Sequence, residues 1–130
     1  MDVDKTRAEL LKAYPGCRVK VAPDQQEMVA EISDCFAVAV IERSVPHFHC
    51  QTREVYRVLR GTLIVACGGQ GQVLQQGETI AIEPGQIHSA RAVGEPAWIE
   101  VESMPSWSAD DHFVLSCHSA CNIDPLSRVS

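Results

Sequence analysis

HFHCQTREVYRVLRG, residues 47–61, is the stretch that decides the fold of this 130-residue chain. His47 and His49 are separated by one residue, so on a β-strand their side chains point to the same face. Glu54 begins the next strand-like run after a short polar connection, and a hairpin at that connection brings its carboxylate beside the two imidazoles. The stretch therefore predicts two paired strands that gather three metal-binding side chains.

A second stretch, GETIAIEPGQIH at residues 77–88, adds a third imidazole. The turn at Pro84 and Gly85 reverses the chain and delivers His88 at the start of the following strand. Three imidazoles and one carboxylate suit one divalent transition metal such as Fe, Zn, Ni or Mn, and not an oxygen-only cation such as Ca²⁺. Four protein ligands on a six-coordinate ion leave two adjacent positions for water, dioxygen or a chelating substrate.

Short strands separated by turns fill the chain on both sides of these stretches. Alternating apolar residues begin at Val19, and turn residues punctuate the pattern. We expect strands at residues 28–33, 36–42, 45–50, 54–59, 62–67, 72–75, 79–82, 86–93 and 97–102. Residues 4–14 have helical spacing, with Asp4 as the N-cap and Pro15 as the stop. Because no later helix is long enough to join parallel strands, the pattern indicates a sandwich or closed barrel.

The two stretches resemble the two motifs of the cupin superfamily, which here span Val45 to His88. The positions that match are His47, His49, Glu54 and Gly61 in the first motif and Gly77, Gly85 and His88 in the second. The second motif departs at Glu83, where the family usually has proline, and at Ala92, where many members have asparagine. Neither position is a metal ligand in the family.

The resemblance implies an all-β fold, a single antiparallel double-stranded β-helix (the cupin or jelly-roll barrel), with a metal near its mouth and often a homodimer. It implies His47, His49, Glu54 and His88 as ligands, although in some similar proteins the glutamate contacts the ligands and not the ion. It implies no single reaction, since the family includes dioxygenases, isomerases, epimerases, lyases, decarboxylases and non-catalytic binders.

We expect one domain with a short N-terminal extension and a tail. Residues 1–18 form the helix and lead-in, residues 19–107 the barrel, and residues 108–130 a C-terminal tail that is partly disordered. Within the tail, Ser108 to Asp111 has the pattern of a capping box that opens a short helix. The first residues lack the apolar core of a signal peptide, which favours a cytoplasmic protein.

The net charge and the apolar runs argue against nucleic-acid and membrane partners, and the cysteines are interpreted separately. The net charge is −6, with 17 acidic and 11 basic residues, which argues against a nucleic-acid surface. No run of eighteen apolar residues is present, so we expect no membrane partner. The six cysteines are expected to be free thiols, with Cys35 among the buried ones and Cys117 and Cys121 in the tail.

Other polar residues allow more than one interpretation. Tyr56 shares its strand face with Glu54, so its phenol either moves a proton at the metal or is an interior aromatic whose hydroxyl has a polar partner. Arg53 and Arg57 have the opposite parity and should pair with acidic neighbours or a second subunit. His112 and His118 lie outside both motifs and are expected to be solvated.

Two classes of function remain open from the sequence. The first is a metal-dependent enzyme that acts on a small polar organic molecule or sugar by isomerase, lyase or dioxygenase chemistry, with Tyr56 as the catalytic proton carrier. The second is a non-catalytic protein that binds a small molecule or sugar and uses the metal as an anchor or as a structural lock. An eight-stranded barrel encloses only a small ligand in either case.

Overall fold

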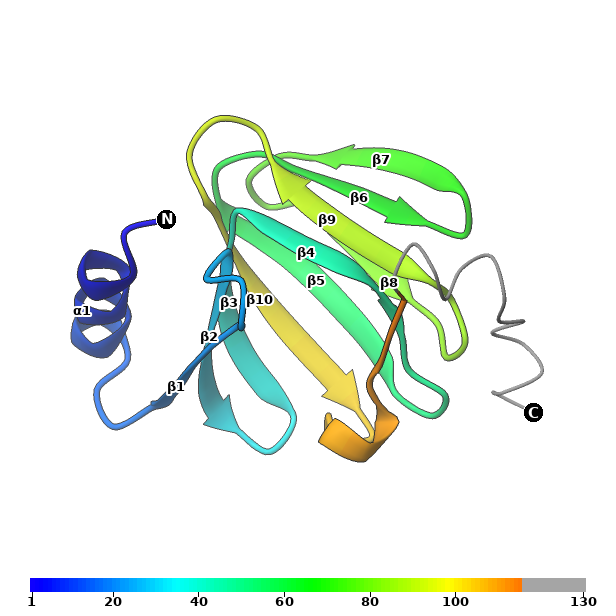
Figure 1. Cartoon of the computed structure of the whole chain (residues 1–130), viewed down its shortest axis with the longest axis horizontal. Helices are drawn as coiled ribbons and strands as arrows, with labels where there is room; N and C mark the ends of the chain where they lie inside the picture. The colour runs from blue at the N-terminus through cyan, green and yellow to red at the C-terminus, as the bar shows by residue number, and fades with distance from the viewer. Residues whose placement is uncertain (116–130) are drawn as a thin grey trace.

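The computed structural model describes residues 1–115, which form two antiparallel sheets and an N-terminal helix (Figure 1). The six-stranded sheet has the order β1-β2-β3-β10-β5-β8, and the five-stranded sheet has the order β11-β4-β9-β6-β7. The strands are β1 (Arg18–Val21), β2 (Glu27–Ser33), β3 (Phe36–Ile41), β4 (Arg43–Phe48), β5 (Arg53–Arg60), β6 (Leu63–Cys67), β7 (Gln70–Leu74), β8 (Thr79–Ile82), β9 (His88–Ala92), β10 (Ala97–Met104) and β11 (Phe113–Val114).

Strands far apart in sequence pair to make these sheets, as the jelly-roll arrangement requires. β10 lies between β3 and β5, and β4 pairs with β9. β5 also pairs with β8, so the strand that carries Glu54 has neighbours that are distant in sequence on both sides. The expected all-β class and double-stranded β-helix are therefore confirmed, and the expected strand series is found with small shifts at its ends.

Apolar side chains from both sheets meet in a core between them. Its buried members are Ala39, Ile41, Tyr56, Val58, Leu63, Val65, Leu74, Ile82, Ala90, Ala97 and Ile99. Full burial of a valine, leucine or isoleucine side chain contributes about 1.5–3 kcal/mol relative to exposure. The four metal-binding candidates of the two motifs, His47, His49, Glu54 and His88, are buried as well.

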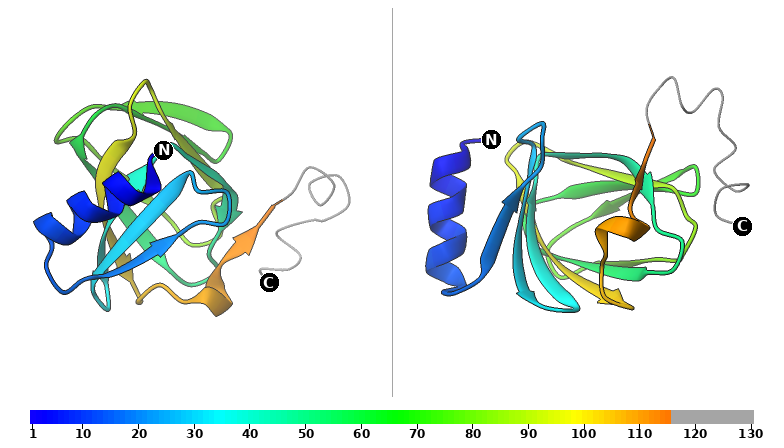
Figure 2. Two further views of the ribbon diagram at one scale, coloured as in Figure 1. Left: turned by 60° about the vertical axis from the view of Figure 1, so that its left-hand side comes forward. Right: turned by 60° about the horizontal axis from the view of Figure 1, so that its bottom comes forward.

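The helix α1 (Val3–Ala13) covers the outside of the six-stranded sheet (Figure 2). Its N-cap is Asp2, whose side chain accepts a hydrogen bond from the Lys5 backbone N–H at 3.1 Å. The expected Asp4 cap is wrong because Asp4 already lies in the first turn, where its negative charge favours the helix N-terminus. Leu10 is fully buried and packs in a second core with Met28 of β2.

Two local expectations about the turns and strand ends are also wrong. The expected strand at residues 45–50 ends earlier, since β4 stops at Phe48 and His49 lies beyond it. Cys35 is exposed and not buried, because it sits in the tight turn between β2 and β3. Within residues 1–115 the free thiols include Cys17, Cys35, Cys50 and Cys67, whereas Cys117, His118 and Cys121 lie outside the described residues.

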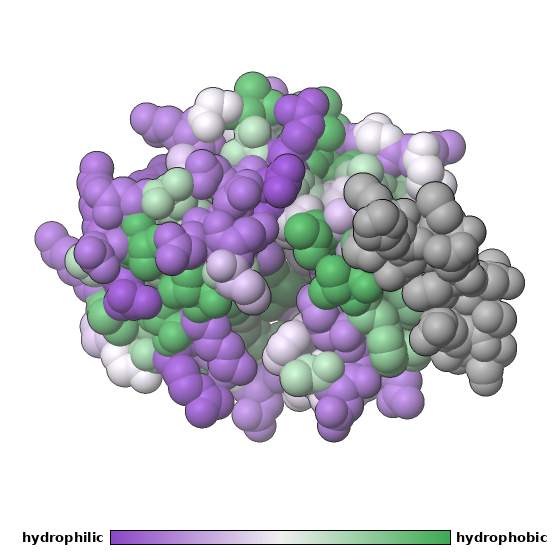
Figure 3. Space-filling view, in the orientation of Figure 1, coloured by the Kyte–Doolittle hydropathy of each residue, from purple (hydrophilic) through white to green (hydrophobic). Residues whose placement is uncertain are grey.

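The surface is mixed in character. Polar residues cover most of the face in view, with smaller hydrophobic patches among them (Figure 3). Among the larger apolar residues that remain exposed are Val45 of β4 and Val114 of β11. In the described part of the chain, no helix combines the length and the apolar character that crossing a membrane would need.

Candidate metal centre

Four side chains from different parts of the barrel converge in its interior. His47 is on β4, His49 follows its end, Glu54 is on β5 and His88 opens β9. Each offers one ligand atom, and these atoms all lie within 4.8 Å of one another. All four residues are buried, with exposed fractions of 8%, 2%, 5% and 1% in that order. The four residues selected from the sequence are thus brought together by the fold.

The three imidazoles are each oriented by a backbone carbonyl. Nδ1 of His47 lies 2.7 Å from the Val45 carbonyl oxygen, and Nδ1 of His88 lies 2.9 Å from that of Gln86. Nδ1 of His49 lies 2.8 Å from the carbonyl oxygen of Asp111. A carbonyl only accepts, so Nδ1 must carry the proton in each ring. The neutral form of each ring then has its lone pair on Nε2.

Two of these lone pairs point at the same carboxylate oxygen. Nε2 of His49 lies 3.1 Å, and Nε2 of His88 lies 3.3 Å, from Oε1 of Glu54. The two nitrogens and the oxygen are buried and have no hydrogen-bond partner among residues 1–115. Buried acceptors that face each other are costly unless a proton or a cation lies between them. Three imidazoles and one carboxylate therefore fit a divalent transition metal here.

The electrostatics of the site follow from burial and from this carboxylate. Burial, reinforced by His88, lowers the pKa of His47 to about 3, so its ring is neutral. Burial alone would raise the pKa of Glu54, but the adjacent imidazoles of His49 and His88 lower it to about 2. Burial also opposes a charge on His49, yet Glu54 raises its pKa. Glu54 is therefore an ionised carboxylate, and its negative charge favours a cationic partner at this position.

Tyr56 lies on the inner face, as its parity with Glu54 predicts. Its ring centroid is 6.3 Å from that of His88, and the side chain is 6% exposed. Burial, followed by the negative charge of Glu54, raises its pKa well above 10, so the phenol keeps its proton.

Arg53 and Arg57 face outward and contact Glu83 at 2.9 Å and Glu100 at 3.9 Å, which confirms their expected acidic partners.

Glu27 is an interior carboxyl group that the sequence reasoning missed. On β2, Met28 packs beneath α1 while Val29 packs against the core between the sheets, so Glu27 shares the inner face with Val29. Burial, together with the negative charges of Glu54 and Asp24, raises its pKa to about 7. The available signal was its place in the alternation of EMVAEIS, where the other face is apolar.

The turn at residues 108–112, called the C-terminal turn below, places residues beside the metal-binding candidates that the sequence did not predict there. His112 was expected to be solvated, but its ring stacks on His47 with centroids 4.7 Å apart, and Trp107 lies 5.7 Å away on another side. Nδ1 of His112 is buried without a hydrogen-bond partner among residues 1–115. The capping-box pattern at Ser108 marked this turn, but nothing in the sequence placed it against the metal-binding residues.

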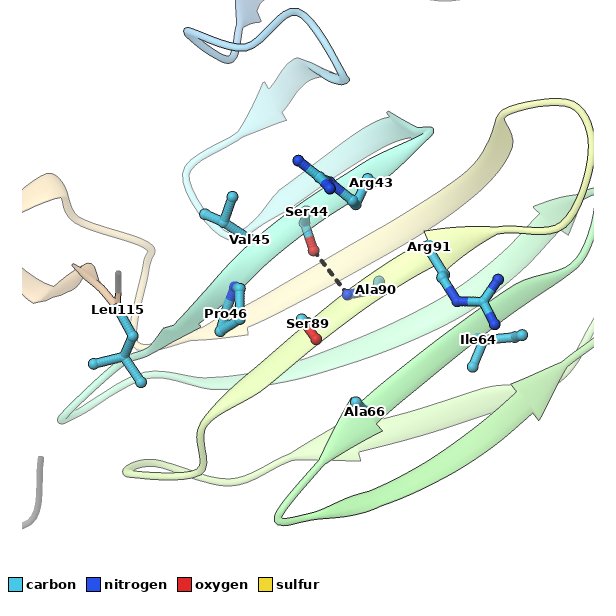
Figure 4. A pocket seen from close by; sticks show the side chains of 10 residues that line it. All are labelled: Arg43, Ser44, Val45, Pro46, Ile64, Ala66, Ser89, Ala90, Arg91 and Leu115. Carbon is cyan, nitrogen blue, oxygen red and sulfur yellow. Dashed lines mark hydrogen bonds between the residues drawn. The ribbon is translucent and has the colours of Figure 1, made fainter. Parts of the chain in front are cut away.

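A separate hollow of about 380 Å³ lies on the five-stranded sheet, away from the four converging residues (Figure 4). Residues of β4, β6 and β9 line it, including Arg43 and Arg91. The Ser44 hydroxyl accepts a hydrogen bond from the Ala90 backbone N–H across its floor at 3.0 Å. None of the four converging residues lines this hollow, so it is not the metal centre.

Comparison with known proteins places the chain in a family. The family model described as "Cupin domain" matches residues 36–101, about half of the chain. The chain therefore belongs to the cupin family, and the matched residues contain all four converging side chains. A comparison with curated proteins gave no match.

Several solved structures share the fold at low sequence identity. A variant of Streptomyces PAC13 with uridine is 8% identical with a TM-score of 0.68, over 78% of this chain and 86% of that one. Another PAC13 structure, described as a nucleoside dehydratase, is 10% identical with a TM-score of 0.64, over 78% and 87%. KdgF from Halomonas sp. is 14% identical with a TM-score of 0.59, over 72% and 89%. These similarities support the fold.

Proposed function

We propose that this protein is a metal-dependent enzyme that acts on a small polar organic molecule or sugar. The observation that carries the proposal is the convergence of the His49 and His88 Nε2 lone pairs on Oε1 of Glu54 in a buried site. His47 completes the set from the adjacent strand. A site that served only packing would not bury four polar side chains together, three of them with an atom that has no hydrogen-bond partner among residues 1–115.

The four residues would hold one ion such as Fe, Zn, Ni or Mn. When bound, the metal supplies Lewis-acid polarisation of a substrate oxygen and, if it is iron, a position for dioxygen. The carbonyl groups that accept hydrogen bonds from each Nδ1 hold the three rings turned so that Nε2 faces the site. The protein itself orients the ligand side chains and, by burying them, keeps water away from the site.

Two interior groups can move protons near the metal ligands. Tyr56 keeps its proton across the physiological range and so serves as a hydrogen-bond donor and general acid. Glu27 has a pKa of about 7 and so exchanges a proton readily near neutral pH. An acid and a base buried near the same carboxylate, Glu54, favour catalysis over simple binding, because catalytic sites are where such shifted pKa values gather.

Isomerase, lyase and dioxygenase chemistry all fit this set of groups. An elimination of water requires a base to remove a proton and an acid to protonate the leaving oxygen, and Glu27 and Tyr56 supply those roles. The description of PAC13 as a nucleoside dehydratase is consistent with the lyase choice, on a shared fold. The interior volume of a small barrel limits the substrate to a small molecule.

A non-catalytic binding protein with a structural metal is the second candidate. It is favoured by the burial of the site, where His49, Glu54 and His88 are each no more than 5% exposed. A closed metal site of this kind links strands of both sheets and stabilises the fold. A homodimer and a cytoplasmic location are further predictions that accompany either function.

The proposal is tested by anaerobic purification, measurement of the bound metal and screening of small sugars and organic acids for turnover. Iron with substrate-dependent oxygen uptake supports a dioxygenase, and zinc, nickel or manganese with product formation but no oxygen uptake supports an isomerase or lyase. A bound ion with ligand binding but no turnover of any retained or added small molecule contradicts the enzyme and supports the binding protein.

A further inference from the structure

The C-terminal turn is capped at its start and paired with the barrel at its end. The 3₁₀ helix η1 (Ala109–Asp111) is capped by the Ser108 hydroxyl, which accepts a hydrogen bond from the Asp110 backbone N–H at 3.2 Å. β11 then pairs with β4 opposite His47 and Phe48, and the ring of Phe113 stacks on Phe48 at 5.1 Å. The turn thus lies beside the metal ligands, although it falls outside the residues matched by the family model.

The carboxylate of Asp111 binds the loop that joins two of the ligands. Its two oxygens accept hydrogen bonds from the backbone N–H groups of Cys50 at 2.7 Å, Gln51 at 3.0 Å and Thr52 at 3.1 Å. This loop begins directly after His49 and ends two residues before Glu54. Although burial raises the pKa of Asp111, these donors outweigh it and hold the pKa below its ordinary value, as expected for an ionised acceptor.

His49 differs from the other two histidines in how its ring is oriented. His47 and His88 each bond to a carbonyl two residues earlier in their own segment, at Val45 and Gln86. The Nδ1 partner of His49 is instead the carbonyl of Asp111, 62 residues away along the chain. Orientation of this one ring therefore depends on the docked turn, and the carboxylate of Asp111 is the side chain of the turn that bonds directly to the loop after His49.

We propose that Asp111 is a positioning residue of the metal centre, acting through His49. Its carboxylate fixes the turn to the 50–52 loop, and its carbonyl then selects the His49 tautomer with the proton on Nδ1 and the lone pair on Nε2. The proposal rests on the proposed function only in assigning the four residues to a metal. It adds a residue outside both cupin motifs to the parts that the centre needs.

The His49 tautomer in the metal-free protein provides a test that does not involve a metal. Long-range ¹H–¹⁵N correlation spectra report which ring nitrogen carries the proton, and at a pH where the ring is neutral wild-type His49 should be protonated on Nδ1. In Asp111→Ala the His49 signals should move toward a mixture of tautomers, while those of His47 and His88 stay unchanged. An unchanged His49 spectrum in this variant overturns the proposal.

Metal affinity provides the second test, with Co²⁺ as the probe and a competing chelator of known affinity. Asp111→Ala should weaken Co²⁺ binding by about 10–100-fold, the usual effect of losing a group that orients a ligand. Asp110→Ala is the matched control, because this neighbouring carboxylate is exposed, and it should change the affinity less than twofold. Equal affinities for wild type and Asp111→Ala contradict the proposal.

A double-mutant cycle separates positioning from general loss of structure. In a His49→Ala background, Asp111→Ala should weaken Co²⁺ binding by less than a further twofold, because the ring on which it acts is gone. A full additional loss in that background contradicts action through His49. If Asp111→Ala does not fold, Asp111→Asn takes its place, since it keeps a carbonyl acceptor, and it should shift both readouts in the same direction by less.

The two tests also separate this proposal from the proposed function. A wild-type protein that binds no Co²⁺ contradicts the metal centre, and the tautomer measurement alone then decides the role of Asp111. Tight Co²⁺ binding together with an Asp111→Ala variant that is normal in both tests contradicts only the positioning role.

Discussion

His47 lies directly opposite His88 in the pairing of β4 with β9, and their ring centroids are 4.1 Å apart. Neighbouring strands of one sheet thus supply two imidazoles, while Glu54 comes from β5 in the other sheet. An ion held by this set would join the two sheets across the interior. Metal binding should therefore be measurable as stability of the whole barrel as well as local order.

Addition of a divalent transition metal should raise the melting temperature of the metal-free protein. An ion at 100 times its dissociation constant stabilises the folded state by about 2.7 kcal/mol. His88→Ala should remove this effect, whereas Arg91→Ala, an exposed position on the same strand, should retain it. Differential scanning fluorimetry with and without Zn²⁺ or Ni²⁺ makes the comparison, and equal shifts in both variants would count against the site.

Replacement of Glu27 should change how stability depends on pH. Its pKa of about 7 in the folded protein exceeds the ordinary value of 4.5, so the folded state keeps a proton that the unfolded state loses as pH rises. The wild type therefore loses stability between pH 4.5 and 7, and Glu27→Gln should be the more stable protein at pH 8 by about 2–3 kcal/mol. At pH 4 the two should be similar. Urea unfolding of the metal-free proteins measures the difference.

Glu31 provides a control of opposite sign on the same strand. Lys20 contacts its carboxylate at 2.6 Å and, with Arg18, lowers its pKa despite partial burial. That contribution is present at neutral pH and is lost as the pH falls through the folded-state pKa. Glu31→Gln should therefore reduce stability at pH 8 and have no effect at low pH. The same pH profile for both variants would refute the assignment of Glu27 to the interior.

Tyr56→Phe should separate chemistry from binding. The ring is buried against the core, so the variant keeps its packing and loses only the hydroxyl. Metal affinity should stay within twofold of wild type, while turnover of a substrate found by screening should fall by about 10²–10⁴-fold if the phenol moves a proton. Steady-state kinetics on the metal-loaded proteins give the result, and unchanged kcat and KM would leave Tyr56 as an interior aromatic only.

Gly61 tests the fold independently of the metal. It has a φ of +92°, and a Cβ built on it would lie 3.3 Å from the Cα of Ala97. Gly61→Ala should cost about 1–3 kcal/mol because alanine is strained in this backbone region and crowds its neighbour. Gly71→Ala, where no atom lies within 4 Å of the added Cβ and φ is not positive, should cost little. Denaturant unfolding compares them, and equal losses would contradict this reading of the turn.

Local sequence patterns predicted much of the architecture and the converging side chains. The His47 and His49 pair, the following Glu54 and the Pro84 turn before His88 are short-range features, so their spacing reflects strand and turn geometry directly. The alternating runs predicted the strands for the same reason. Strand ends were less well predicted, because the end of β4 before His49 depends on pairing with distant segments.

The parts of the site that were missed depend on contacts between remote segments. Asp111 reaches the loop after His49 across about 60 positions, and His112 stacks on His47 through the same docking. Nothing in the local sequence around Asp111 specifies that partner. Glu27 carried a weak signal in its strand parity, but its raised pKa arises first from burial in the folded protein and then from the charge of Glu54, on a strand that is distant in sequence.

Elemental analysis of the purified protein tests the central claim most directly. Wild-type protein, loaded with a divalent transition metal and passed through a desalting column, should retain one ion per chain, and a His47→Ala/His88→Ala variant that remains folded should retain none. Retention of the same amount of metal by both proteins, or the absence of tightly bound metal from the wild type after loading, would contradict the account.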